Sequence, residues 1–325
     1  MDGVNEIQSS SFKGCGHLIS VVLPQSVATI GEEAFAACPL LEQITINSGV
    51  KWIGNRAFEK SQSLRSIDIP DSVESLGEMA FFGCAGLTSA TIGTALQAIK
   101  RHSFFGSGLK SISLGSSITT IGTYAFAETP LQSVVIPDTT THIEDLAFWK
   151  CHNLSTVLLG TSLQKIGDEV FFETNLTSIV IPDSVLSIGE SAFTKCYNLQ
   201  SVTLGQSLTY IGPIAFFQSV KEIVVPPTVT TIAHFAFASL DKVTVEGYYG
   251  CGLEHPVTIG LLTFPGCQVS GIFIFIYIYT SQDVVVMGDI YMLLFCFLCR
   301  LWELLYLMLV ISMKKYADSS LCVMI

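Results

Sequence analysis

The stretch IPDSVLSIGESAFTKCYNLQSVTLG, residues 181–205, decides the fold, because nearly the same pattern recurs along most of the chain. Its central frame, Ile-Gly-x-x-Ala-Phe, occurs with variations eleven times at intervals of 21 to 23 residues. The phenylalanines of these copies are Phe12, Phe35, Phe58, Phe81, Phe104, Phe126, Phe148, Phe171, Phe193, Phe216 and Phe237. Such a period predicts a solenoid, because one unit is too small to bury a core and neighbouring units must share one.

A second frame, Leu-x-x-Ile-x-Ile, follows each phenylalanine, as in LRSIDI from Leu64. Leu64, Ile67 and Ile69 alternate there with mostly polar residues, which predicts one short strand per repeat with an apolar inner side. In nine of the eleven units the residue after this strand is proline or glycine, which ends strand pairing and begins a turn.

The segment between the turn and the phenylalanine is apolar at spacings that fit either a single helical turn or an irregular arc. We expect the phenylalanines to form an internal column, because an exposed row of eleven aromatic rings would be an aggregation surface.

Proline follows the strand at positions 24, 70, 137, 182 and 226, and glycine or asparagine mostly follows it in between. The duplicated unit is therefore expected to be a pair of repeats of about 45 residues.

The complete pattern, Leu-x-x-Ile-x-Ile-Pro-x-Ser-Val-x-x-Ile-Gly-x-x-Ala-Phe-x-x-Cys, resembles the BspA-type (Treponema-type) leucine-rich repeat over residues 4–246. The resemblance implies a leucine-rich-repeat solenoid of about eleven repeats. Each repeat would contribute a short parallel strand and an irregular or short helical convex side. The resemblance implies less about function, because the scaffold has diverse partners; many members are surface or adhesion proteins of microbes.

Composition and motifs argue against several function classes. The formal net charge is −11, and an acidic solenoid is a poor partner for nucleic acid, which requires clustered lysine and arginine. No phosphate-binding glycine loop or His-Glu-x-x-His motif occurs, and the six histidines are scattered over different repeats. The Cys296–Cys299 pair has CxxC spacing but no second ligand pair. We therefore predict no enzyme activity, no cofactor and no metal site.

Five of the ten cysteines occupy one slot, three residues after the repeat phenylalanine: Cys15, Cys38, Cys84, Cys151 and Cys196. Serine or threonine fills this slot in other repeats, which indicates a small buried thiol rather than a disulfide. A disulfide is conceivable in this slot only between Cys15 and Cys38, whose repeats are adjacent. Cys251 and Cys267 could form a disulfide that holds a capping segment if the protein is extracellular.

The outward side chains of the strands are the best candidate for a binding surface, because solenoids present them as one extended face. They are mostly hydroxyl-bearing or β-branched, with an apolar bias around Val135, Leu158 and Val180. The predicted binding residues are Ser89, Thr91, Ser111, Ser133, Val135, Thr156, Leu158, Ser178 and Val180. The alternative is that serine, threonine and valine are simply good strand residues. Asn153 and Asn175 begin N-glycosylation sequons, which the repeat pattern also generates by chance.

Three regions are expected: a solenoid at 1–246, a cap or linker at 247–271, and a hydrophobic tail at 272–325. Residues 290–313 are long enough to span a membrane, although Arg300 and Glu303 lie near the middle. Lys314 and Lys315 would place the solenoid outside, whereas a tail anchor without a signal peptide would leave it inside. Translated intron sequence and a buried capping element are the alternatives.

The leading hypothesis is a non-enzymatic recognition scaffold that binds protein or glycan, at the membrane or cell surface and tethered through residues 290–313. The alternative is a soluble cytoplasmic interaction or structural scaffold whose hydrophobic tail is a gene-model artefact. The two differ in whether the chain has an upstream signal sequence and a translated tail.

Overall fold

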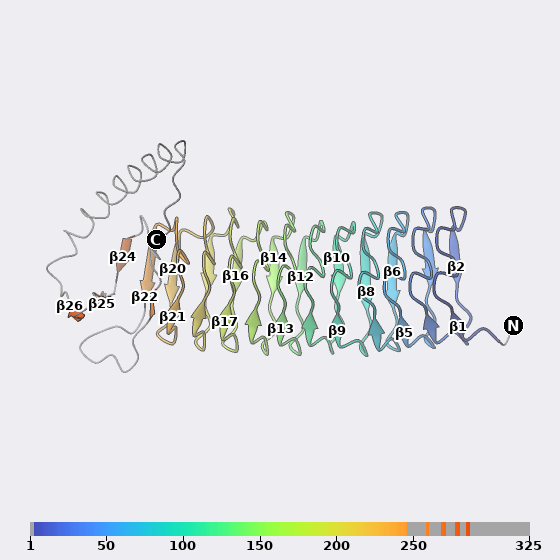
Figure 1. The fold of residues 1–325 in the computed structure, drawn as a ribbon, viewed down its shortest axis with the longest axis horizontal. Coiled ribbons are helices and arrows are strands. Elements are labelled where there is room, and N and C mark those ends of the chain that lie inside the picture. Colours follow the sequence, from blue (N-terminus) through green and yellow to red (C-terminus); the bar gives the residue numbers. More distant parts are fainter. Residues whose placement is uncertain (1–2, 246–257, 260–267, 271–276, 280–283, 287–325) are drawn as a thin grey trace, which may run out of the picture. The chain divides into compact units, whose positions relative to one another are not determined.

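In the computed structural model, the described residues are 3–245, 258–259, 268–270, 277–279 and 284–286. The chain divides into two compact units, Met1–Gly271 and Ile272–Ile325. In the first unit the repeats stack in one row, and each repeat passes through two short strands (Figure 1). The predicted parallel-strand solenoid is confirmed, and the second strand of each repeat is a feature that the sequence pattern did not predict.

The first strand of each repeat is the one predicted from the Leu-x-x-Ile-x-Ile frame. These strands are β2 (Ser20–Val22), β4 (Gln43–Thr45), β6 (Ser66–Ile69), β8 (Ser89–Ile92), β10 (Ser111–Ser113), β12 (Ser133–Val135), β14 (Thr156–Leu158), β16 (Ser178–Val180), β18 (Ser201–Thr203), β20 (Glu222–Val225) and β22 (Lys242–Val245). A further strand that was not predicted, β24 (Gln268–Ser270), pairs in parallel with β22. In the described part of the chain these strands form five short parallel sheets, and within each sheet neighbours pair at equivalent positions, for example Ser133 with Thr156 and Val135 with Leu158. Equivalent side chains therefore form columns across the repeats.

The second strand consists of the isoleucine or leucine of the Ile-Gly step and the residue before it, and this isoleucine or leucine is buried in every repeat from β3 to β21. These strands are β1 (Glu6–Ile7), β3 (Thr29–Ile30), β5 (Trp52–Ile53), β7 (Ser75–Leu76), β9 (Ala98–Ile99), β11 (Thr120–Ile121), β13 (His142–Ile143), β15 (Lys165–Ile166), β17 (Ser187–Ile188), β19 (Tyr210–Ile211), β21 (Thr231–Ile232) and β23 (Thr258–Ile259). They form parallel sheets of four and eight strands. Two residues are too few to show alternation, so this strand left no periodic signal.

The segment after the second strand carries the repeat phenylalanine and is irregular; none of the described residues lies in a helix. Its amides nevertheless form a third ladder between repeats, as where the N–H of Phe126 donates to the carbonyl of Ala147 at 2.9 Å. In most repeats, residues two before and two after the phenylalanine have a left-handed backbone, such as Tyr124 and Glu128. This backbone turns the segment sharply while its alternate amides still face the next repeat.

The phenylalanines form the predicted internal column, which we call the core ladder. From Phe35 to Phe237 every ring of the ladder is fully buried, whereas Phe12 at its start is 37% exposed. Successive rings lie 5.1 to 5.8 Å apart with interplanar angles of 1° to 22°. Each ring thus packs against both neighbours, and the core continues from repeat to repeat.

Where glycine follows the first strand, it lies close to the backbone of the preceding repeat. A side chain at Gly160 would place its Cβ 2.1 Å from the carbonyl oxygen of Pro137 in the preceding repeat. Asp138, which follows that proline, accepts hydrogen bonds from the backbone N–H and the hydroxyl of Thr161 at 2.9 and 3.0 Å. These bonds hold the pKa of Asp138 below its usual value. At this pair of repeats the proline side and the glycine side therefore contribute different groups to the contact.

The cysteine slot is buried, as predicted. The thiols of Cys38, Cys84, Cys151 and Cys196 donate to the carbonyl oxygen of the phenylalanine one repeat earlier at 3.0 to 3.1 Å. Ser61 makes the same contact with its hydroxyl at 2.7 Å, which explains why the slot accepts serine. Cys15 and Cys38 are both free, so the conceivable disulfide between them is not formed. Cys251, Cys267 and the CxxC pair lie outside the described residues.

Burial makes these thiols unreactive. It raises the pKa of Cys84 to about 12 and that of Cys151 and Cys196 to about 11. We expect iodoacetamide at pH 8 to label the partly exposed Cys15 and to spare Cys84, Cys151 and Cys196 until the chain is unfolded. Peptide mass spectrometry after timed alkylation measures this. Rapid labelling of the three buried thiols in the native chain would contradict the packing described above.

The same thiols predict a loss of stability at alkaline pH. Their protons are bound in both states below the unfolded pKa of about 8.5, so no effect is expected there. As the pH rises toward 11 or 12 the unfolded state loses these protons first, and the free energy of unfolding falls. Denaturant midpoints between pH 7 and 10 should therefore drop less in a variant with serine at all three positions.

The described part of the second unit is an antiparallel pair, β25 (Tyr277–Tyr279) with β26 (Val284–Val286). Within the described residues, no helix has the length and apolar character needed to cross a membrane. The candidate span at 290–313 lies outside the described residues.

Candidate binding face

The outward side chains of the even-numbered strands β2 to β22 form one continuous surface, which we call the strand face. All nine predicted binding residues lie on it, in two adjacent columns. Parallel pairing brings Ser89 beside Ser111 and Ser178 beside Ser201. Eight of the nine are exposed and Ser89 is partly exposed. The structure thus brings together residues up to about ninety positions apart in the sequence.

An apolar column crosses the middle of the strand face. Val135, Leu158 and Val180 occupy equivalent positions on β12, β14 and β16, and 61%, 60% and 65% of their surfaces are exposed. The outward residues beside them on these strands are Ser133, Thr156 and Ser178, which are neutral. Three large aliphatic side chains on one column, without a charged neighbour on the same strands, make this the most apolar part of the strand face.

Charged groups lie toward the two ends of the strand face. Arg65 pairs with Glu42 at 2.8 Å near the beginning of the row, and Lys242 lies 3.9 Å from Glu222 near the end of the described repeats. These ion pairs are exposed and contribute little to stability. They do flank the neutral middle, so a partner seated on the apolar column would meet no fixed charge there.

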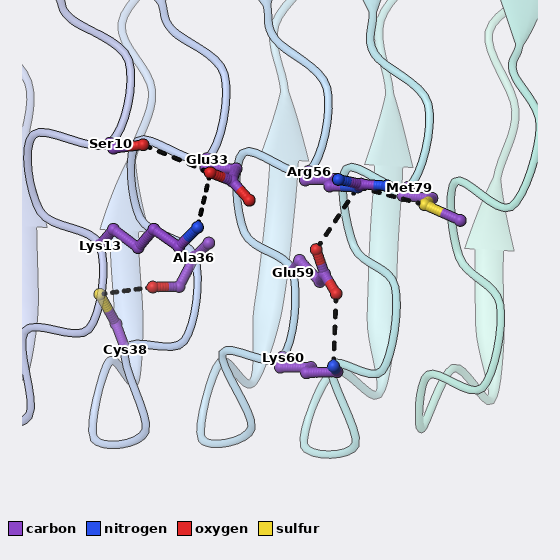
Figure 2. Close-up of polar contacts among 9 residues, drawn as sticks. All are labelled: Ser10, Lys13, Glu33, Ala36, Cys38, Arg56, Glu59, Lys60 and Met79. Carbon is purple, nitrogen blue, oxygen red and sulfur yellow. Dashed lines mark hydrogen bonds and ion pairs between the residues drawn. The ribbon is translucent and has the colours of Figure 1, made fainter.

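The irregular segments carry a different set of side chains at the first repeats. Figure 2 shows Lys13 beside Glu33 at 2.6 Å, with Arg56 and Lys60 approaching Glu59 at 3.7 and 3.5 Å. The hydrogen bond from Lys13 holds the pKa of Glu33 below its usual value. The Lys13–Glu33 pair thus joins two successive repeats, whereas both ion pairs of Glu59 lie within one repeat.

In the middle repeats the same segments carry aromatic side chains, which the sequence analysis missed. We call this set the aromatic strip: Phe82, His102, Phe105, Tyr124, Trp149 and Phe172, all partly buried. His102 stacks on Tyr124 with ring centroids 4.9 Å apart, and Lys150 lies 4.1 Å above the Trp149 ring. Burial lowers the pKa of His102. The available signal was a second aromatic residue directly after the ladder phenylalanine in several repeats.

A hollow of about 410 Å³ lies beside β11, β13 and β15. It is lined by Thr120, Thr123, His142, Ile143, Glu144, Asp145 and Lys165. Its carboxylates already bond to the backbone, because Glu144 accepts from Thr123 N–H at 2.9 Å and Asp145 accepts from Asp168 N–H at 2.9 Å. Across the described ranges, no group of three or more His, Cys, Asp or Glu side chains is placed to hold a metal ion.

The two sequon asparagines differ in accessibility. Asn153 is exposed, whereas Asn175 is partly buried and its side-chain oxygen accepts a hydrogen bond from the side chain of Asn198. Asn153 is therefore the better acceptor for a glycan if the chain meets the glycosylation machinery.

Comparison with known proteins identifies the repeat. Residues 5–131 and 119–244 match the family model described as BspA type Leucine rich repeat region, with six copies. A comparison with curated proteins gave no match.

Several solved structures are similar to this chain. A leucine-rich repeat protein from Bacteroides ovatus has 26% identity and a TM-score of 0.62, over 77% of this chain and 63% of its own. The chain thus spans less than two thirds of the length of that protein. A leucine rich cell surface protein from Faecalibacterium prausnitzii has 28% identity and a TM-score of 0.48, over 74% and 76%. The pneumococcal vaccine antigen PcpA, at 19% identity and a TM-score of 0.50 over 82% and 73%, shares the fold.

Proposed function

Because this chain belongs to the BspA-type leucine-rich repeat family, we propose that it is a non-enzymatic scaffold that binds a protein partner through the strand face. The observation that carries the proposal is the exposed apolar column of Val135, Leu158 and Val180. Three aliphatic side chains at equivalent positions on neighbouring strands are costly to leave in water, and burying them under a partner would be favourable. The comparisons indicate no enzyme family.

The chemistry of the strand face favours protein over glycan as the occupant. Its two outward columns contain no aromatic side chain from β2 to β22, so a sugar ring would find no flat apolar surface. Aliphatic side chains flanked by hydroxyl groups suit instead the apolar side chains and backbone amides of a polypeptide. Since no charged side chain accompanies the column on β12 to β16, binding should depend little on ionic strength.

A peptide library displayed on phage and selected on the full chain would test this proposal. We expect selected peptides to be apolar and to lose at least about tenfold in affinity when Val135, Leu158 and Val180 are all replaced by serine. Serine already occupies this column at Ser113, so the variant should fold. Val22→Ser is the matched control, because Val22 lies in the same column on β2 and is 78% exposed. Equal losses in both variants, or none in the triple variant, would exclude this part of the strand face.

We also propose that the scaffold is displayed at the cell surface and tethered through residues 290–313. The apolar character of that segment and the exposure of Asn153 in its sequon support this location. Full-length transcript sequencing across both ends of the gene would test it. An upstream signal sequence with an intact tail agrees with the proposal, whereas splicing near codon 268 would favour the soluble cytoplasmic scaffold.

A further inference from the structure

A smaller hollow of about 220 Å³ is formed by the residues that follow the ladder phenylalanines Phe148, Phe171 and Phe193 in three consecutive repeats. We call it the edge pocket, and its lining residues are His152, Glu173, Thr174, Asn175, Lys195, Tyr197 and Asn198. None of them belongs to the strand face or to the aromatic strip. The hollow is smaller than the roughly 300 to 1,000 Å³ of sites for drug-sized ligands, so it has room for a single small ring.

A difference in repeat length explains why the hollow lies here. Leu154 follows Phe148 by six residues and Leu199 follows Phe193 by six, but Leu176 follows Phe171 by only five. The middle repeat therefore lacks one residue between two longer neighbours. His152 and Tyr197 follow the cysteine slot of the longer repeats, and Asn175 follows the same slot of the short one. The residues that line the hollow thus come from the two longer repeats and from the shorter repeat between them.

The lining combines an exposed ring with amide groups. Tyr197 is 67% exposed, and its hydroxyl group makes only a long contact of 3.5 Å with Gln218. Asn175 and Asn198 are bonded to each other through one oxygen and one nitrogen, so each amide retains capacity for another partner. The face of an aromatic ring packs well against the apolar C–H groups of a ligand. A side-chain amide can both donate a hydrogen bond to a ligand's hydroxyl group and accept one from it. A pyranose ring has both kinds of surface.

The charged groups of the edge pocket neutralise each other. Lys195 donates to Glu173 at 2.8 Å, and its ammonium group also lies 5.1 Å from the ring centre of Phe172. The pair lowers the pKa of Glu173 and raises that of Lys195, so both stay charged near neutral pH. His152 contacts the backbone oxygen of Glu173 at 3.0 Å. With the charges paired and a chain of net charge −11, an acidic ligand has no local attraction to the pocket.

We propose that the edge pocket binds the terminal ring of a neutral saccharide, with Tyr197 against one face of the ring and the amides of Asn175 and Asn198 at its hydroxyl groups. The remaining sugars would extend into solvent, since the pocket is open and holds one ring. An open site of this size predicts weak binding, with a dissociation constant of about 0.1 to 1 mM for a single saccharide. This site is independent of the strand face.

Saturation-transfer NMR on the full chain with a panel of neutral, sialylated and sulfated oligosaccharides would test this. We expect signals from neutral saccharides that disappear in Tyr197→Ala and weaken at least about tenfold in Asn198→Ala. Tyr197→Phe should bind within about twofold of the unchanged chain, because the ring rather than the hydroxyl group makes the main contact. Tyr210→Ala is the matched control, since Tyr210 is an exposed tyrosine on β19, outside the pocket.

Three results would overturn the proposal: no signal from any neutral saccharide, a signal that survives Tyr197→Ala, or a preference for sialylated or sulfated sugars. Far-ultraviolet circular dichroism of each variant checks that the solenoid is intact. Peptide binding at the strand face should be unchanged in Tyr197→Ala, so failure of one proposal is distinguishable from failure of the other.

Discussion

Replacing Phe126 by alanine is expected to lower the free energy of unfolding by about 3 to 5 kcal/mol. The ring is fully buried and stacks on Phe104 and Phe148, with centroids 5.4 and 5.3 Å away. Its removal leaves a cavity in the middle of the row and breaks two ring contacts at once. Because solenoid stability depends on contacts between neighbouring repeats, unfolding should also become less cooperative. Urea denaturation followed by circular dichroism measures both effects.

Phe12→Ala provides the control. Phe12 begins the core ladder, is 37% exposed and stacks on Phe35. Its loss should cost roughly 1 to 2 kcal/mol, because part of the ring is already in water. A loss below about 1 kcal/mol at Phe126, or equal losses at both positions, would mean that the ladder does not form the core.

Replacing Gly160 by alanine is expected to destabilise the chain by about 3 kcal/mol, although only one methyl group is added. The new Cβ would lie 2.1 Å from the oxygen of Pro137 and 2.8 Å from Cα of Asp138. Both are backbone atoms, so relief requires the two repeats to move apart. That movement would stretch the bonds between Asp138 and Thr161 and the pairing of β12 with β14. The midpoint of urea unfolding measures the loss.

Gly106→Ala separates this steric effect from the general cost of replacing a glycine. Gly106 has a φ of +60° and no atom near the position of a new Cβ. The strain of a left-handed alanine is about 1 kcal/mol and is partly offset in the unfolded chain. The equivalent positions Lys60 and Glu128 already hold larger residues in the left-handed conformation. An effect at Gly106 as large as that at Gly160 would contradict the close contact between repeats.

The two binding proposals have different physical bases. The strand face is apolar in its middle and would hold a polypeptide by burying aliphatic side chains, with little effect of salt. The edge pocket is small and polar with one exposed ring, and would hold one neutral sugar unit. A scaffold with both surfaces could bind a glycosylated protein at two points, and the serine and Tyr197 variants described above would separate the contributions.

The sequence by itself determined the solenoid, the repeat length, the first strand and the buried column of phenylalanines. It could do so because these features are repeated many times. The residues equivalent to Phe126 have the same buried environment in each repeat from Phe35 to Phe237. The cysteine slot was predictable for the same reason, since exchange among cysteine, serine and threonine describes a small buried site.

Only the tertiary structure decided what lies between repeats. The second strand has only two residues, too few to show the alternation of a strand, so its pairing becomes visible only when repeats are stacked. The aromatic strip and the edge pocket join residues that differ from one repeat to the next, such as Trp149 and Tyr197, and repetition therefore cannot reveal them. The edge pocket lies where a repeat with the shorter spacing, that of Phe171, stands between two repeats with the longer one, and this neighbourhood exists only in the stacked structure.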